Sequence, residues 1–215
     1  GTCQIADWAG SNNNESQYSH PGQVSQQNGS LVLRADRDPG WSFGREFNSG
    51  LVRSCQEWSH GRFEVRARVP NGQGFWPAIW LLPRGASWPA GGEIDIMESV
   101  NFADRIYGTI HFGNEGQGSV TSGTSVVTGE DYGSQFAVYR VDRYPDRMEW
   151  YLNGQLFHTA YSTTWFSGAT DNFLAPFEQD FHFIFNVAVG GNFPGNPNGA
   201  SVFPQQMRVD WVRVY

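Results

Sequence analysis

Apolar and polar residues alternate one by one along several short stretches of the chain, which is the period of a β-strand with one buried face. The clearest stretch runs from Arg62 to Val69, where Phe63, Val65 and Ala67 share one side. The turn pair Asn153-Gly154 predicts a hairpin within 148–158. Alternation, or a short apolar run between turn residues, predicts the other strands over 31–35, 74–82, 108–112, 136–143, 181–189 and 207–215.

The composition favours strands joined by turns over long helices. The chain has 26 glycines and 11 prolines, with 16% charged and 15% aromatic residues. We therefore expect an all-β fold, in which two antiparallel sheets stack as a curved β-sandwich (jelly roll) with a concave substrate cleft. The 215 residues are expected to form a single domain, 1–215. The segment 113–133, rich in Gly, Ser and Thr, is predicted to be a loop that borders the cleft.

Charge and cysteine content narrow the classes of partner. A net charge of −7 argues against nucleic acid and against an anionic membrane, because both need a basic footprint, and a neutral polymer fits better. No apolar run approaches the roughly 20 residues of a membrane helix, and the sequence starts without an apolar signal segment. The two cysteines, Cys3 and Cys55, leave a disulfide and a buried thiol pair both open.

Three acids lie inside one strand-like run, residues 93–98. Glu93 and Asp95 are two apart and share a strand face, whereas Glu98 has the opposite parity. One extra residue, accommodated as a β-bulge around Met97, restores the register and brings Glu98 to the same face. The sequence therefore predicts a row of three carboxylates.

A row of carboxylates is either a solvated polar face or a site that uses the charges. Neighbouring carboxylates repel one another and resist burial, so an ordinary half-buried strand has little reason to carry them. Two carboxyl groups facing one sugar are the machinery of glycosidases, in which one attacks the sugar and the other protonates the leaving oxygen. Glu93 and Glu98 are the candidates for these roles, with Asp95 between them to tune their charges.

Residues 92–98, Gly-Glu-Ile-Asp-Ile-Met-Glu, resemble the signature of glycoside hydrolase family 16, in the bulged form typical of its laminarinases, the endo-acting 1,3-β-glucanases. Further blocks resemble the family in the family's order: 61–66, 72–82, 108–112, 186–195 and 203–215. The resemblance implies a retaining endo-1,3-β-glucanase with Glu93 as nucleophile and Glu98 as general acid/base. It also implies a β-glucan polysaccharide or oligosaccharide as partner and no cofactor for catalysis.

Other functions share this fold and motif. The same signature serves hydrolases of mixed-linkage glucans and of marine galactans. A non-catalytic β-glucan-binding module also has the fold but lacks the catalytic glutamates, and this sequence carries both glutamates.

Further residues are candidates for contacts with the sugar. Trp88 lies in a Pro- and Gly-containing loop before the acidic strand, where an indole can stack on a sugar ring. Trp76 and Trp80 are four apart and share a strand face, which is either core or cleft. The resemblance places His111 in the cleft near the acid/base. Asn186 interrupts an apolar strand, as either a bonded core amide or a cleft residue.

Two features depart from the family or extend the resemblance. Where the family often has an arginine that lines a sugar subsite, this chain has Leu51, and Arg53 lies two residues later. Asp210 matches a family position that often binds a structural Ca²⁺, together with a backbone carbonyl near Gly29. A single carboxylate could equally be a solvated acid, because Ca²⁺ takes six to eight oxygen ligands.

The location and assembly of the protein follow from its expected substrate. An enzyme that degrades a polymer must usually meet it outside the cell, so we expect a secreted protein. We also expect a monomer.

Overall fold

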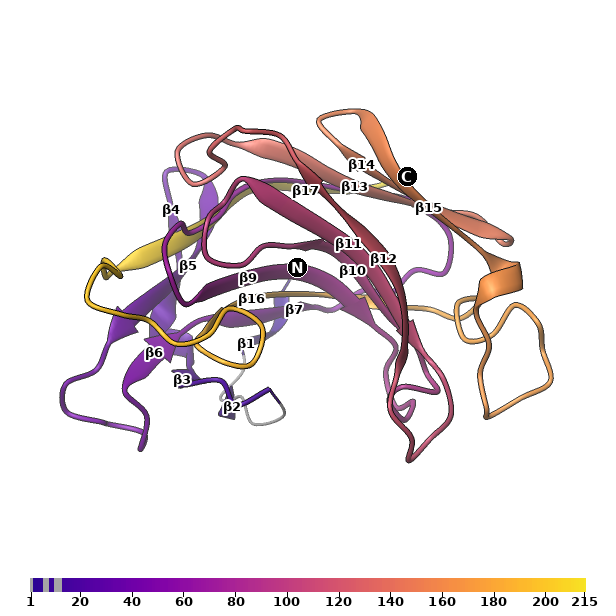
Figure 1. Cartoon of the computed structure of the whole chain (residues 1–215), viewed down its shortest axis with the longest axis horizontal. Coiled ribbons are helices and arrows are strands. Elements are labelled where there is room, and N and C mark those ends of the chain that lie inside the picture. Colours follow the sequence, from indigo (N-terminus) through magenta and orange to yellow (C-terminus); the bar gives the residue numbers. More distant parts are fainter. Residues whose placement is uncertain (1, 6–7, 10–12) are drawn as a thin grey trace.

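The computed structural model describes residues 2–5, 8–9 and 13–215, and nearly all of its regular structure is β-strand (Figure 1). The strands are β1 (Thr2–Ile5), β2 (Trp8–Ala9), β3 (Gln17–Ser19), β4 (Val24–Gln27), β5 (Ser30–Arg37), β6 (Phe47–Ser49), β7 (Leu51–Ser54), β8 (Gly61–Arg68), β9 (Phe75–Leu82), β10 (Glu93–Glu98), β11 (Arg105–Phe112), β12 (Val120–Val127), β13 (Ala137–Arg143), β14 (Arg147–Leu152), β15 (Gln155–Tyr161), β16 (His182–Val189) and β17 (Gln205–Val214). Two short 3-10 helices, η1 (Pro21–Gln23) and η2 (Ser162–Thr164), complete the described elements.

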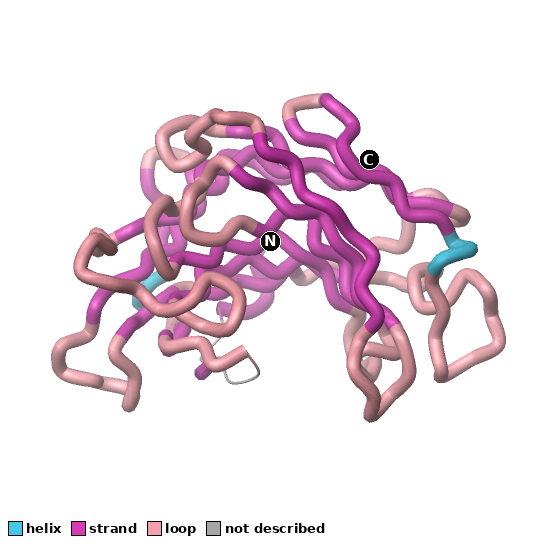
Figure 2. The backbone as a smooth tube through the Cα atoms, viewed as in Figure 1, coloured by secondary structure: helices cyan, strands magenta, loops and turns pink. Residues whose placement is uncertain are grey.

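The strands form two stacked sheets, as predicted for a jelly-roll sandwich. The first sheet has seven strands in the order β1-β7-β16-β9-β10-β11-β12. The second has the order β15-β14-β13-β8-β17-β5-β6-β3-β2, with β4 paired to β5. The seven-stranded sheet bends like an arch, and loops connect the strands at both ends (Figures 1 and 2).

The core lies between the two sheets and is built by the alternating positions that the sequence indicates. On β8, Phe63, Val65 and Ala67 are fully buried, while the residues between them are not. The side chains of β16 are all buried, but only Phe183, Phe185, Val187 and Val189 join the main core cluster. The other residues of β16 face the opposite side of the seven-stranded sheet, which is therefore the side available for a substrate.

One pair of strands runs parallel, against the expectation of purely antiparallel sheets. β3 pairs with β6 in parallel, with Tyr18 opposite Asn48. The chain reverses twice between them, because β4 and β6 both pair antiparallel to β5. β3 leads into β4 through η1 without a reversal of direction. After the two reversals at β5 and β6, β6 therefore runs in the same direction as β3.

The prediction of a loop over 113–133 is wrong in part, because β12 (Val120–Val127) lies within it. β12 pairs along its whole length with β11, from Phe112↔Val120 to Arg105↔Val127. It is the edge strand of its sheet and is mostly exposed, so it lacks the apolar alternation by which the other strands are found. Serine, threonine and glycine suffice here because the backbone ladder, more than side-chain burial, holds the strand.

The disulfide alternative is supported at Cys55, which is disulfide-bonded. The side chain of Cys3 lies outside the described side chains, but the backbone register places Thr2 opposite Ser54 and Gln4 opposite Arg53. Across the part of the chain that the structure describes, no helix is long and apolar enough to cross a membrane.

Trp150 pins the acidic strand to the second sheet. Its side chain is fully buried, and its indole Nε1–H donates a 2.8 Å hydrogen bond to the backbone oxygen of Asp95. A Cβ on Gly108 would lie 2.5 Å from Trp150 Cδ1, so only glycine on the neighbouring strand leaves room for the indole. The position of β10 thus depends on a contact that passes through the core.

Replacing Trp150 with phenylalanine should destabilise the protein. The Asp95 carbonyl loses its donor in a buried place, which alone costs about 1–3 kcal/mol, and the smaller ring leaves a void. Urea denaturation would measure the loss, with Trp41→Phe as control because Trp41 is 57% exposed. Equal unfolding midpoints for Trp150→Phe and the wild type would contradict the proposed anchor.

Candidate active site

The three acids of β10 share the face that points away from the core. Against β9, Asp95 lies opposite Trp80 and Glu98 lies opposite Ala78. Trp80 and Ala78 are two positions apart, whereas Asp95 and Glu98 are three positions apart, so β10 has one extra residue here. Against β11, Ile96 and Met97 together face Gly108, the single residue between Thr109 and Tyr107. This is the β-bulge expected around Met97. It brings Glu93, Asp95 and Glu98 into one row.

The neighbouring strand completes the row. On β11, His111 lies opposite Glu93, Thr109 opposite Asp95 and Tyr107 opposite Glu98. Thr109 and Tyr107 were missed by the sequence analysis. Alternation from His111 finds Thr109 within the predicted strand 108–112, and it would have found Tyr107 had the strand been extended to Arg105.

Two indoles hold the outer acids. Trp88 Nε1–H donates to Glu93 Oε2 over 2.7 Å, and Trp76 Nε1–H donates to Glu98 Oε1 over 2.8 Å. Trp88 is 51% exposed, so its ring remains available to a ligand as well. Trp76 therefore faces the acids and not the core, which decides between the two alternatives left by the sequence.

Asn186 is both a hydrogen-bonded buried amide and a residue of the cleft face, the two alternatives that the sequence left open. It is buried, with 8% exposure, yet it lies on the same sheet face as the acids, opposite Ala78 of β9. Its Oδ1 accepts a 2.7 Å hydrogen bond from Trp80 Nε1. The amide thus fixes the indole next to Asp95.

His111 lies beside the row of acids. It is opposite Glu93 in the strand register, and its Nε2 is 3.2 Å from Asp95 Oδ2. Its charge also acts to lower the pKa of Glu98, the expected acid/base. Thr121 Oγ1 lies 3.1 Å from the other ring nitrogen, Nδ1. His111 is therefore a partner of the central acid.

Glu93, Asp95 and His111 are also a group of possible metal ligands in the described part of the chain, with one ligand atom of each within 4.8 Å of the others. Glu93 Oε2 already accepts a hydrogen bond from Trp88. Asp95 Oδ2 lies 3.2 Å from His111 Nε2, but among the described residues it has no hydrogen-bond partner. The composition of the group fits a set of interacting acids as well as it fits a cation site.

Burial raises the pKa of all three carboxyl groups. It raises the pKa of Glu93 to about 8, with a further contribution from the charge of Asp95. The pKa of Asp95 is also raised, first by burial and then by the charge of Glu98. Burial raises the pKa of Glu98, while the Trp76 hydrogen bond opposes the rise.

The row therefore shares protons near neutral pH. Three carboxylates at this spacing cannot all ionise in a buried site, and their titration belongs to the group as a whole. A protonated Asp95 can donate a hydrogen bond to Glu93, and this hydrogen bond would stabilise the charged form of Glu93. Such a row can offer one carboxylate and one carboxylic acid at the same time, which is what acid-assisted nucleophilic attack requires.

The comparisons with known proteins agree with this chemistry. The family model described as glycosyl hydrolases family 16 matches residues 11–213. The chain belongs to this family.

Named relatives extend the comparison. A glucan endo-1,3-beta-glucosidase A1 of Niallia circulans is 36% identical over 98% of this chain, which spans only 33% of that relative's length. A keratan-sulfate endo-1,4-beta-galactosidase of Sphingobacterium multivorum is 36% identical over 94% of this chain and 48% of its own. The laminarinase catalytic domain of Thermotoga maritima is 32% identical, with a TM-score of 0.82 over 94% of this chain and 84% of its own.

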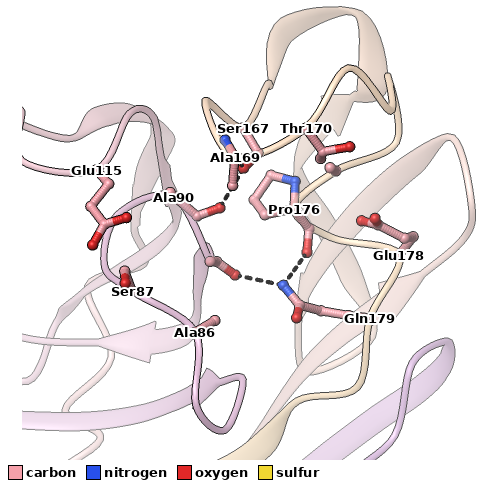
Figure 3. Close-up of a pocket in the computed structure, with 12 residues that line it drawn as sticks. Ala86, Ser87, Ala90, Glu115, Ser167, Ala169, Thr170, Pro176, Glu178 and Gln179 are labelled. Atoms are coloured by element: carbon pink, nitrogen blue, oxygen red, sulfur yellow. Dashed lines mark hydrogen bonds between the residues drawn. The ribbon is translucent and has the colours of Figure 1, made fainter.

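A segment of the family 16 domain after β15 supports the Trp88 loop (Figure 3). Ser167 Oγ–H donates to the backbone oxygen of Ala90 over 2.7 Å, and Gln179 Nε2–H donates to that of Gly91 over 3.0 Å. Ser167 also forms an isolated bridge with Gly113. These contacts fix the loop that brings the Trp88 indole to Glu93.

Beyond the acids, the same face of the sheet continues over β9, β16 and β7. Its residues there are first apolar and then, at Arg53, basic. Leu51 and Ile184 are buried there, with Trp80 and Leu82 packed against them. Arg53 of β7 lies opposite Ile184 of β16. The Nε of Arg53 is buried, and it has no hydrogen-bond partner among the described residues. This apolar patch was not foreseen, although Leu51 in place of the family's arginine was its signal.

The predicted metal residues lie away from the acids, on the second sheet. Asp210 forms an ion pair with Arg66, and Gly29 lies in the turn between β4 and β5 with φ +79°. The Arg66 guanidinium neutralises the Asp210 carboxylate in this arrangement. Because Ca²⁺ takes six to eight oxygen ligands, a bound ion would need more oxygens than Asp210 and the Gly29 carbonyl supply.

The raised pKa of Glu93 should make stability depend on pH. The folded row of acids keeps a proton up to about pH 8, the raised pKa of Glu93, whereas this group releases its proton near pH 4.5 in the unfolded chain. The unfolding free energy should thus be highest below pH 4.5 and fall through this window, by at most about 1.4 kcal/mol per pH unit from this group. Glu93→Gln removes the group, so its melting temperature relative to the wild type should rise across the window.

The matched control is Glu130→Gln, because Glu130 is exposed and outside the row. Differential scanning calorimetry at both ends of the window would measure the effect. The assignment fails if Glu93→Gln changes the melting temperature by the same amount at both ends.

Proposed function

We propose that the protein is a retaining endo-1,3-β-glucanase that cleaves laminarin-type glucans by double displacement. The observation that carries the proposal is the row of three acids on the open sheet face, with Trp88 at one end. The family and its retaining mechanism support the reaction type. The glucanase and laminarinase relatives support the linkage.

In the first step Glu93 attacks the anomeric carbon and the glycosidic C–O bond breaks. Glu98 transfers its proton to the departing oxygen, so that the leaving group departs as an alcohol and Glu98 becomes a carboxylate. Trp76 Nε1–H, already bonded to Glu98 Oε1, stabilises that carboxylate. Asp95 lies between the two and keeps the row's remaining proton next to Glu93.

In the second step Glu98 acts as base. It takes a proton from water, the hydroxide oxygen attacks the anomeric carbon, and the ester bond to Glu93 breaks. Both residues return to their starting protonation states. Two inversions give net retention at the anomeric carbon.

Trp88 and the neighbouring indoles are proposed as sugar contacts. Trp88 is exposed next to the nucleophile, so its ring can stack on the apolar face of a bound sugar. We assign substrate contacts to Trp88, His111 and Trp76, and we assign Asn186 the role of fixing Trp80.

A second candidate substrate is a β-galactan, because one relative at the same identity is named as a keratan-sulfate endo-1,4-beta-galactosidase. The catalytic row would serve either sugar, since the acids contact the anomeric centre and its leaving oxygen. Reducing-end release from laminarin and from keratan sulfate would separate the two. The non-catalytic alternative is disfavoured because both glutamates are present.

Four expectations from the sequence stay predictions. They are secretion, a monomeric state, a single domain over 1–215, and a structural Ca²⁺ at Asp210 and Gly29. The disulfide at Cys55 is consistent with an oxidising compartment. Calcium binding would require Asp210 to give up its pair with Arg66, and a melting temperature that rises with calcium and falls with chelator would support it.

The division of labour between the glutamates can be tested by azide rescue. Glu93→Ala and Glu98→Ala should both lose nearly all activity on laminarin, the latter by about 10²–10⁴-fold. In the Glu93 variant, azide should attack the sugar directly and give a glycosyl azide of inverted configuration. In the Glu98 variant, an activated aryl glycoside should still form the ester, which azide would intercept with net retention.

Proton NMR of each azide product gives the stereochemistry, and Glu130→Ala serves as a control that should keep full activity. Retention from the Glu93 variant together with inversion from the Glu98 variant would reverse the two roles. Full laminarin activity in either variant would sink the mechanism.

A further inference from the structure

We propose that the substrate face ends in a subsite for an anionic substituent of the glycan, a sulfate ester or a uronate carboxylate, which is bound by Arg53. The inference rests on the proposed glycanase function and names a feature of its substrate.

The strand register places Arg53 in line with the catalytic row. Arg53 lies opposite Ile184, Ile184 opposite Trp80, and Trp80 opposite Asp95. Three strand spacings of about 4.8 Å separate Arg53 from Asp95. A glycan chain that crosses the strands from the acids would therefore reach Arg53 within a few sugar units.

The side chains between them suit a sugar ring. Leu51 and Ile184 are completely buried on this face, and the half-buried Trp80 and Leu82 pack against them. The apolar face of a pyranose can pack on the accessible parts of Trp80 and Leu82 while its substituents point outward. Leu51 offers no hydrogen bond, whereas Arg53, two residues along β7 and on the same face, carries a guanidinium.

Arg53 belongs to a basic corner, defined as Arg53, Glu57, Arg84 and His182. Glu57 is the one acid of the four, and it pairs with Arg84 at 3.0 Å. Arg84 also donates to the backbone oxygen of Ser54 over 2.7 Å. His182 Nδ1 lies 3.8 Å from Glu57 Oε1. The corner thus carries an excess of positive charge in a protein with a net charge of −7.

Arg53 is the cation of this corner whose charge is not neutralised. Among the side chains that the structure describes, its buried Nε has no hydrogen-bond partner. Burial and the charge of Arg84 lower its pKa, so the protein around it disfavours the charge. Burying an uncompensated cation is unfavourable, and an anionic ligand would remove that cost.

The chemistry of arginine favours an oxyanion as the ligand. Its planar guanidinium binds carboxylate and sulfate oxygens through two parallel hydrogen bonds. A hydroxyl of a neutral sugar would satisfy one donor but not the charge. The expected ligand is therefore a β-glycan that carries a sulfate or carboxylate a few sugar units from the cleaved bond.

The test compares neutral laminari-oligosaccharides with two derivatives of the same length, one sulfated at O6 and one oxidised at C6 to glucuronate. Arg53→Gln should lower kcat/KM on an anionic derivative by about tenfold or more through KM. Its kcat/KM on the neutral oligosaccharide should stay within about twofold of the wild type. The two derivatives together show whether the site prefers sulfate or carboxylate.

Two controls separate recognition from stability. Arg34→Gln makes the same change in net charge on the second sheet, where Arg34 pairs with Asp36, and should affect neither substrate. The melting temperature of Arg53→Gln should equal or exceed that of the wild type, because the substitution removes an unpaired charge near Arg84. A large fall in melting temperature would show that Arg53 is structural and would overturn the proposal.

Binding measurements distinguish a failure of the anionic subsite from a failure of the proposed enzymatic function. Calorimetric titration of Glu93→Gln with each oligosaccharide, with and without Arg53→Gln, needs no turnover. Tighter binding of an anionic derivative that Arg53→Gln abolishes supports the subsite, even if wild-type protein fails to cleave laminarin and the proposed function falls. Equal affinity for neutral and anionic oligosaccharides, unchanged by Arg53→Gln, would overturn the subsite alone.

Discussion

The structure depends on keeping three carboxyl groups close together on one face of a well-packed sheet. Burial of Glu93, Asp95 and Glu98 opposes folding, since each is driven toward its neutral form. The opposite face of the same strand supplies the compensation, because Ile94, Ile96 and Met97 are completely enclosed in the core. The bulge joins the two requirements by adding one core residue without turning Glu98 away.

The partners of the acids follow from the same constraint. Each carboxyl group has one partner from a different segment: Trp88 from the preceding loop, His111 from β11 and Trp76 from β9. The contacts leave the outer acids partly accessible while they fix the direction of each side chain. The Trp88 loop is in turn fixed by Ser167 and Gln179, which lie far along the chain (Figure 3).

Sequence patterns predicted the parts of the structure that depend on burial. Alternation found β8 and the apolar run found β16, because both strands contribute to the core. These patterns missed β12, a mostly exposed edge strand from which Val126 packs against the core. They also missed the parallel pairing of β3 with β6, which depends on the path of the chain between them.

In the candidate site, too, local sequence predicted some features, while others depend on how distant segments meet. Parity and one bulge placed the three acids in a row from local sequence alone. The contact of His111 with Asp95 depends on the register between two strands, which no single strand encodes, so local sequence does not predict it. The basic corner joins Arg53, Arg84 and His182 from three segments, and its excess charge is visible only when these segments meet.

The central claim is that Glu93 forms the covalent bond to the sugar. Incubation with a 2-deoxy-2-fluoro glycosyl fluoride of laminaribiose, followed by peptide mass spectrometry, tests it directly, because the fluorine slows hydrolysis of the ester more than its formation. We expect one fluoroglycosyl group, attached to Glu93, and time-dependent loss of activity. A label on Glu98 or Asp95 instead would contradict the account.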